Sequence, residues 1–164
     1  MQETVLLMLS IEPLIWKEIG TATACGVILG FERQLKGKPA GMRTSILICL
    51  GTYIFVKLGS SVAGDSTGAV RAVGQVVTGI GFLGAGVILA RDGILQGVTS
   101  AAVIWILAAL GAMIGRGYCG APIMVTLLVV IVLTGVDQLE KTFGSLRKGV
   151  HAKIDGQTNP PLDK

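Results

Sequence analysis

The sequence is poor in charge and in the residues that build catalytic and metal sites. Only 15% of its 164 residues are charged, and it holds a single histidine. The three cysteines, Cys25, Cys49 and Cys119, lack the spacing of metal ligands, and we interpret them as small packing residues. Serine, histidine and acidic residues form no catalytic pattern, and no phosphate-binding loop is recognisable. We therefore expect no enzymatic activity and no cofactor.

Hydrophobic residues, by contrast, make up 51% of the chain and fall into several long runs. The mean hydropathy of +0.72 is more than one soluble core of this size needs. The net charge of +4 would suggest nucleic-acid binding in a soluble protein, but the positive-inside bias of membrane proteins accounts for it here. The sequence thus predicts an all-α, polytopic membrane protein whose first partner is the lipid bilayer, with no nucleic acid bound.

Five transmembrane helices are expected, because each apolar run is long enough to cross about 30 Å of hydrocarbon at roughly 1.5 Å per residue. They cover residues 13–31, 44–62, 70–90, 98–115 and 119–136. An interfacial segment, 1–12, precedes the transmembrane domain 13–137, and a short cytoplasmic tail, 138–164, follows it. The N-terminal segment lacks the basic region of a secretory signal, so we expect no cleavage.

The basic residues predict the orientation of these helices, because cytoplasmic loops carry an excess of Lys and Arg. Ten of the fourteen lie on the side of the first loop and the C-terminal tail: Arg33, Lys36, Lys38, Arg43, Arg91, Lys141, Arg147, Lys148, Lys153 and Lys164. The other side holds Lys17, Lys57, Arg71 and Arg116. We therefore predict an external N-terminus and a cytoplasmic C-terminus.

The most distinctive apolar run is 74–90, GQVVTGIGFLGAGVILA, which has five glycines and no charge. Glycine weakens a helix in water, but in lipid the helix persists and glycine lets a neighbouring helix approach closely. We expect this helix to be the central, most tightly packed one, against a helix of the same chain or of a homodimer. The glycines expected to form close helix contacts, here and in the first span, are Gly26, Gly30, Gly79, Gly81, Gly84 and Gly86.

Polar residues of the first loop, ERQLKGKPAGMR, are candidates for a binding site. Glu32, Arg33, Arg43 and Thr44 flank glycines and a proline that fix the shape of the loop. We expect them to bind an ion, a lipid head group or a partner protein. The alternative is an ordinary charged loop that only sets the topology.

A second set of polar residues, Arg71, Gln75 and Thr78, recurs at steps of four and three and so shares one helical face. Polar groups inside a membrane are functional candidates. The alternative is that Arg71 reaches the interface while the other two bond neighbouring helices. Asp65 is a weak candidate for a metal ligand, because Mg²⁺ needs more anionic oxygen than one exposed carboxylate supplies. Thr99 and Ser100 are expected to cap the fourth span.

Three stretches together resemble the MgtC/SapB family of bacterial membrane proteins: GFERQLKGKPAGMRTSILICLG (30–51), RAVGQVVTGIGFLGAGVILA (71–90) and GVTSAAVIWILAALGAMIG (97–115). Many members continue into a cytoplasmic domain of the ACT type, for which the residues after Asp137 are too few. The resemblance therefore covers the membrane domain only. It implies a multi-pass protein of the bacterial inner membrane, linked to adaptation to low magnesium and to virulence.

Two functions remain open from the sequence. The first is a regulatory or accessory protein that acts through a membrane partner; the resemblance implies the F-type ATP synthase as one such partner, with Mg²⁺ as a ligand or signal. The second is a small transporter of magnesium or another cation. Against transport, the second, fourth and fifth spans carry no acid or base near their centre, and no inverted repeat is visible.

Overall fold

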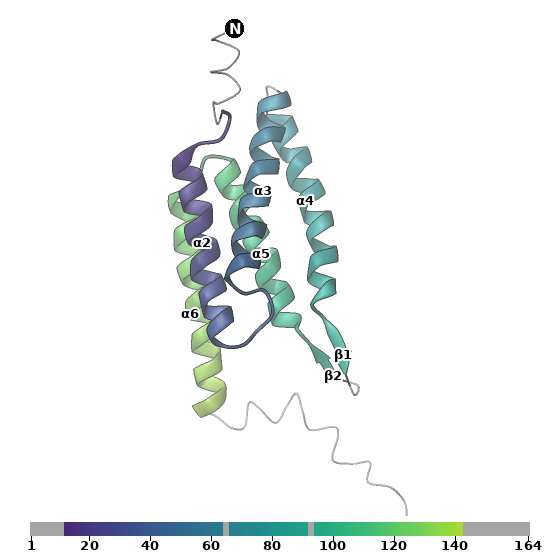
Figure 1. Cartoon of the computed structure of the whole chain (residues 1–164), viewed down its shortest axis with the longest axis vertical. Helices are drawn as coiled ribbons and strands as arrows, with labels where there is room; N and C mark the ends of the chain where they lie inside the picture. The colour runs from purple at the N-terminus through teal and green to yellow at the C-terminus, as the bar shows by residue number, and fades with distance from the viewer. Residues whose placement is uncertain (1–11, 64–65, 92–93, 143–164) are drawn as a thin grey trace, which may run out of the picture. The chain divides into compact units, whose positions relative to one another are not determined.

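The computed structural model describes residues 12–63, 66–91 and 94–142, and these residues form five long helices and one short hairpin. Figure 1 shows their arrangement. The elements in chain order are α2 (Trp16–Leu35), α3 (Met42–Ala63), α4 (Ser66–Gly86), β1 (Leu89–Arg91), β2 (Ile94–Gln96), α5 (Val98–Gly115) and α6 (Gly120–Thr142). The expected all-α fold is confirmed.

Four of the helices are long and apolar enough to cross a membrane: Met42–Val62, Thr67–Gly86, Val98–Gly115 and Gly120–Leu139. They correspond to the last four of the five expected spans, so the protein is a multi-pass membrane protein. The first expected span coincides with α2, which is not among the four because it carries charged residues at both ends. Its crossing of the membrane stays a prediction, as does the orientation of the termini.

Residues 87–96 differ from the expectation, because the third span ends earlier than predicted. The helix stops at Gly86, and β1 and β2 pair antiparallel with Leu89 opposite Gln96 and Arg91 opposite Ile94. Gly97 follows with φ +91°, a conformation that glycine adopts without strain, and α5 begins at the next residue. The two strands therefore replace the last turn of the expected helix.

The centre of the bundle is formed by α3 and α5, and the prediction that the glycine-rich helix is central is wrong. Half of the α5 span, 50%, is buried, against 11% of the α4 span. Helix α3 packs against α2, α4 and α5, whereas α4 packs only against α3 and α5 among its substantial contacts. Small residues allow close approach but do not specify a neighbour within the chain, so a glycine-rich helix can lie at the edge.

The tightest contacts in the bundle join α2 to α3 and α3 to α5. A Cβ atom built on Gly26 would lie 2.6 Å from Ile46 Cα, and one built on Gly30 would lie 2.5 Å from Met42 Cα. Gly111 meets the backbone of α3 in the same way. Only glycine allows these approaches, because any side chain would push the backbones apart.

Among the described residues, those up to Val129 belong to one compact unit, and residues 130–142 belong to another. In the first unit, Thr126 donates a hydrogen bond from its hydroxyl to the carbonyl of Pro122 at 2.8 Å. In the second, Thr134 does the same to Val130 at 2.7 Å. Threonine satisfies its hydroxyl within its own helix in both places, which suits a helix in lipid.

Candidate functional site

A buried cluster of charged residues lies at the C-terminal end of α2. Glu32 and Arg33 are 7% and 3% exposed. The Arg33 guanidinium donates a hydrogen bond from Nη2 to Ser100 Oγ on α5 at 2.7 Å. The Glu32 carboxylate forms an ion pair with Lys36 at 2.6 Å and a longer one with Arg33 at 3.8 Å. The cluster therefore fastens α2 to the start of α5.

Two members of this cluster keep unused hydrogen-bonding capacity within the described part of the chain. Glu32 Oε2 and Arg33 Nε are buried without a hydrogen-bond partner, whereas Glu32 Oε1 lies within ion-pair distance of Lys36 Nζ. A buried charge is retained only where opposite charge compensates it. The arrangement holds charge in place at the contact between α2 and α5.

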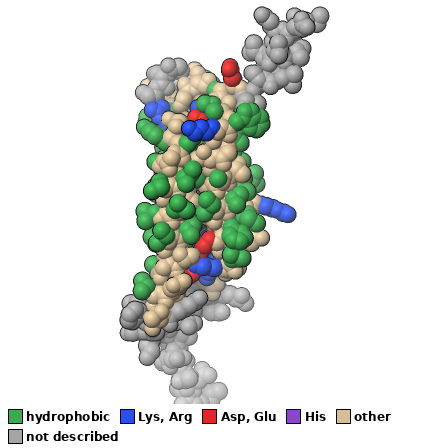
Figure 2. Space-filling model, turned by 90° about the vertical axis from the view of Figure 1, so that its left-hand side faces the viewer, with side chains coloured by type: hydrophobic (Ala, Val, Ile, Leu, Met, Phe, Trp, Pro, Cys, Tyr) green, Lys and Arg blue, Asp and Glu red, His purple; other side chains and the backbone are tan. Residues whose placement is uncertain are grey.

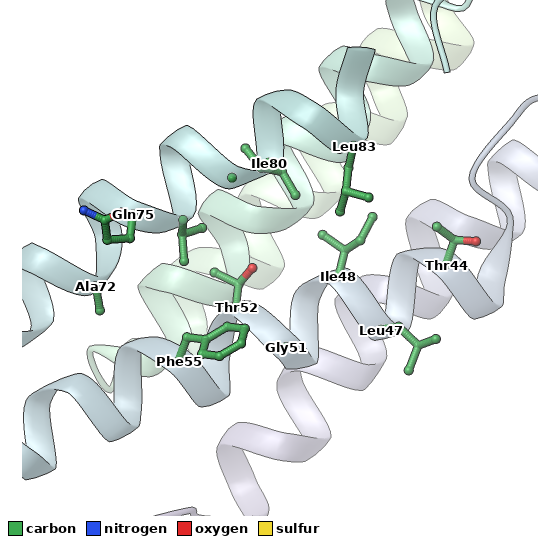
Figure 3. Close-up of a pocket in the computed structure, with 12 residues that line it drawn as sticks. Thr44, Leu47, Ile48, Gly51, Thr52, Phe55, Ala72, Gln75, Ile80 and Leu83 are labelled. Carbon is green, nitrogen blue, oxygen red and sulfur yellow. The ribbon is translucent and has the colours of Figure 1, made fainter. Parts of the chain in front are cut away.

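The structure separates Arg43 and Thr44 from Glu32 and Arg33. Both Arg43 and Thr44 are exposed at the start of α3, outside the buried cluster. The four residues predicted to act together thus form one buried pair and one exposed pair. Thr44 instead lines a groove between α3 and α4 of about 610 Å³, which Gln75 also lines (Figure 3).

The second predicted set, on α4, lies at the surface. Arg71, Gln75 and Thr78 are all exposed. The hydroxyl of Thr78 bonds the carbonyl of Gly74 at 3.1 Å, within its own helix. The structure therefore contradicts the alternative in which Thr78 forms a hydrogen bond with a neighbouring helix.

The predicted packing glycines fall into two groups. Gly26 and Gly30 lie against α3, as described above, and a Cβ built on Gly84 would lie 3.7 Å from the Ala101 side chain of α5. Gly79, Gly81 and Gly86 have no atom of the described chain within 4 Å of a built Cβ. For this second group, contact with a helix of another molecule stays a prediction.

Sequence reasoning missed a second buried ion pair at the opposite end of α2. Glu18 is 4% exposed, and its two carboxylate oxygens lie 2.9 and 2.8 Å from Lys57 Nζ on α3. Beside it, the fully buried Tyr53 accepts a hydrogen bond at its hydroxyl oxygen from the Ile15 backbone at 3.0 Å. The available signal was an acid and a base near the same end of two adjacent apolar runs.

Ser100 was also given the wrong role. The N-cap of α5 is Gly97, and no side-chain hydrogen bond caps the helix. Ser100 accepts the hydrogen bond from Arg33 instead. The buried guanidinium competes for the same hydroxyl, and hydrogen bonds to charged groups are stronger than neutral ones.

Charged side chains lie at the surface in a few places only. On the face in Figure 2, hydrophobic side chains are spread over the described surface, and acidic and basic atoms lie against each other near its two ends. In residues 12–63, 66–91 and 94–142, no group of three or more His, Cys, Asp or Glu could hold a metal ion. Asp65 lies outside the described residues.

Comparison with known proteins identifies relatives over most of the chain. It is 41% identical to YhiD of Escherichia coli (strain K12), named as a proposed magnesium transporter, over 152 residues that cover 87% of this chain and 69% of that protein. It is 34% identical to the protein MgtC of Brucella abortus (strain 2308), over 83% of this chain and 60% of that protein. It is 39% identical to the protein SrpB of Synechococcus elongatus, over 73% of each. The chain thus spans 60–73% of these relatives.

No solved structure matches the chain. The MgtC family, in contrast, matches residues 19–142, which include the Glu32–Arg33 cluster, Lys57 and the glycine-rich helix. The resemblance found in the three sequence stretches is therefore confirmed, and the chain belongs to the MgtC family.

Proposed function

We propose that this protein is a regulator in the bacterial inner membrane that acts by binding another membrane protein, and that it does not itself conduct magnesium. The outer face of α4 carries this proposal. Four small residues on it, Gly74, Thr78, Gly81 and Ala85, recur at steps of four, three and four, and all are exposed. A seam with that spacing lets a second helix approach closely.

The polar residues of α4 add to the case for a protein partner. Arg71 lies beside this small-residue seam, and Gln75, which also lines the groove toward α3, follows Gly74 of the seam directly, within a helix long enough to cross the membrane. Side-chain amides in lipid favour hydrogen bonds across helix interfaces. A partner helix seated on α4 would give Gln75 such a bond, whereas lipid tails would not.

The buried charges of the bundle are better suited to holding helices together than to passing an ion. Conduction requires sites that admit an ion and release it. Glu18 and Glu32 each have a cation from the same chain as their nearest counter-charge, namely Lys57 and Lys36. A divalent cation entering either site must first displace that amine.

Family membership supports a role in adaptation to low magnesium, and we propose that Mg²⁺ acts as the signal. The F-type ATP synthase is the partner that we propose to test first. The second candidate, transport of magnesium or another cation, is favoured by the name of YhiD, to which the chain is 41% identical. The two functions differ in whether purified protein moves the ion.

The first test is a flux assay. Purified protein in liposomes, given a magnesium gradient and an internal indicator dye, should show no flux above empty vesicles. Protein-dependent flux that Gln75→Leu abolishes would overturn the regulatory proposal and make α4 the wall of a pathway.

The second test looks for the partner directly. A photo-crosslinking residue at Gly81 should capture a membrane protein in cells, whereas the same residue at Leu128, which is 58% exposed on α6, should capture far less. Equal capture at both positions would show that α4 has no specific partner.

A further inference from the structure

A groove lies between α3 and α4, and most of the side chains that line it are apolar. Its volume of about 610 Å³ falls in the range of roughly 300–1,000 Å³ that is typical of ligand sites. Figure 3 shows side chains of both helices facing this space. The residues that line it are Thr44, Leu47, Ile48, Gly51, Thr52, Phe55, Ala72, Gln75, Val76, Gly79, Ile80 and Leu83.

The groove is a wedge that closes at one end. At Gly59 the two helices nearly touch, because a built Cβ would lie 2.9 Å from Ala72 Cβ and 3.0 Å from the Gly68 carbonyl oxygen. Away from this contact α3 and α4 diverge, as Figure 1 shows. The buried residues Ile80, Ile104 and Ala108 pack together, with Ile48 and Val76 of the groove lining against them. The wedge therefore has a packed floor.

The length of the groove matches one leaflet of a bilayer. From Thr44 to Phe55 the lining covers twelve residues of α3, and the eleven steps between them span roughly 16 Å at 1.5 Å per residue. Half of a hydrocarbon core of about 30 Å is about 15 Å. Because Thr44 lies near the start of the Met42–Val62 span, the groove runs from one membrane surface to about the middle.

Basic residues stand at the open end of the wedge. Arg43 precedes Thr44, is exposed, and lies one helical turn before Leu47 on the same strip of α3. The loop that carries the exposed Lys38 leads into α3, and its Ala40 packs against the floor of the groove. Positive charge at this position attracts the phosphate of an anionic lipid.

We propose that the wedge binds one acyl chain of an anionic phospholipid, whose phosphate lies beside Arg43. The groove narrows toward the contact at Gly59, which suits a thin, flexible chain better than a helix about 10 Å across. An acyl chain is thinner and has no backbone groups to satisfy. The site is separate from the small-residue seam of α4, because Gly79 in the groove and Gly81 in the seam point about 200° apart around the helix.

The glycines of α4 provide a matched pair of variants. A Cβ built on Gly79 or on Gly81 meets no atom of the described residues within 4 Å, so a side chain can begin at either position without a backbone clash. Gly79→Leu fills the groove and Gly81→Leu does not. For the experiment, the full chain is first placed in nanodiscs that contain equal amounts of phosphatidylglycerol and phosphatidylethanolamine. It is then purified from them, and native mass spectrometry measures the lipid that each variant retains.

The unmodified protein and Gly81→Leu should retain phosphatidylglycerol, and Gly79→Leu should lose most of it. Arg43→Gln should lower the preference for the anionic lipid about fivefold, as expected for one basic residue at an anionic surface. Arg116→Gln, which removes an exposed arginine after α5, should leave the preference unchanged. Equal retention by the two leucine variants overturns the acyl-chain site, and an unchanged preference in Arg43→Gln overturns the assignment of the phosphate.

Discussion

Replacing Lys57 with methionine should destabilise the protein, because it removes the partner of a buried carboxylate. Glu18 has only 4% of its surface exposed, and both of its oxygens contact Lys57 Nζ, at 2.9 and 2.8 Å. Breaking a buried ion pair from one side costs about 3–5 kcal/mol, since the remaining charge stays desolvated. Methionine preserves most of the aliphatic volume of lysine, so lost packing contributes little.

Thermal unfolding of the full chain in lipid nanodiscs, followed by circular dichroism, measures this effect. For a soluble domain of comparable length each kcal/mol lowers the midpoint by roughly 2–4 °C, which scales to a fall of roughly 6–20 °C. The matched control is Lys17→Met, since Lys17 is an exposed lysine of α2. Substitution of an exposed residue of this kind changes the free energy of unfolding by about 0.5 kcal/mol at most.

A double variant separates the charge effect from a packing effect. Adding Glu18→Gln to Lys57→Met removes the unpaired charge and should recover part of the lost stability. The reasoning is refuted if Lys57→Met and Lys17→Met shift the midpoint equally, or if the double variant is no more stable than Lys57→Met alone.

Two further predictions concern packing and topology. Gly30→Leu should lower the yield of folded protein in detergent, because the added Cβ would lie 2.5 Å from Met42 Cα. The control, Gly20→Leu, should fold normally, because a Cβ built there meets no atom of the described residues within 4 Å. Similar yields of the two variants would show that α2 and α3 separate easily. A reporter enzyme inserted at Gly37 should lie in the cytoplasm, and one inserted at Gly117 should lie outside it, as the distribution of basic residues requires. If both reporters lie in the same compartment, one of α3, α4 and α5 does not cross the membrane.

The helices could be predicted from the sequence because their signal is local. Long apolar runs between charged loops located α3, α5 and α6 closely, since a lipid environment leaves such a run little choice but a helix. The close helix contact of Gly26 and Gly30 could also be predicted from their four-residue spacing, and both residues contact α3. Of the candidate site, Glu32 and Arg33 were correctly grouped with each other.

The arrangement of the helices could not be predicted in the same way, because it depends on contacts between distant residues. Glu18 and Lys57 lie 39 positions apart, and nothing in the local pattern pairs them. The glycines of α4 permitted a central position but did not require one, so the sequence suggested α4 where the structure has α5. Short strands such as Leu89–Arg91 are also hard to distinguish from the end of an apolar helix.

The pairing of Arg33 with Ser100 has a consequence for how the protein is made. The two residues are 67 positions apart, so at about 5–20 residues per second the ribosome adds Ser100 roughly 3–13 s after Arg33. Throughout that interval the guanidinium has no serine to bond, and a charged group without a partner favours water over hydrocarbon. The α2–α3 hairpin, closed by contacts of Gly26 and Gly30 with residues nearby in sequence, can assemble during this time. Arrival of α5 then dehydrates the arginine, so the last step of burial in the nascent chain waits for the third helix synthesised after α2.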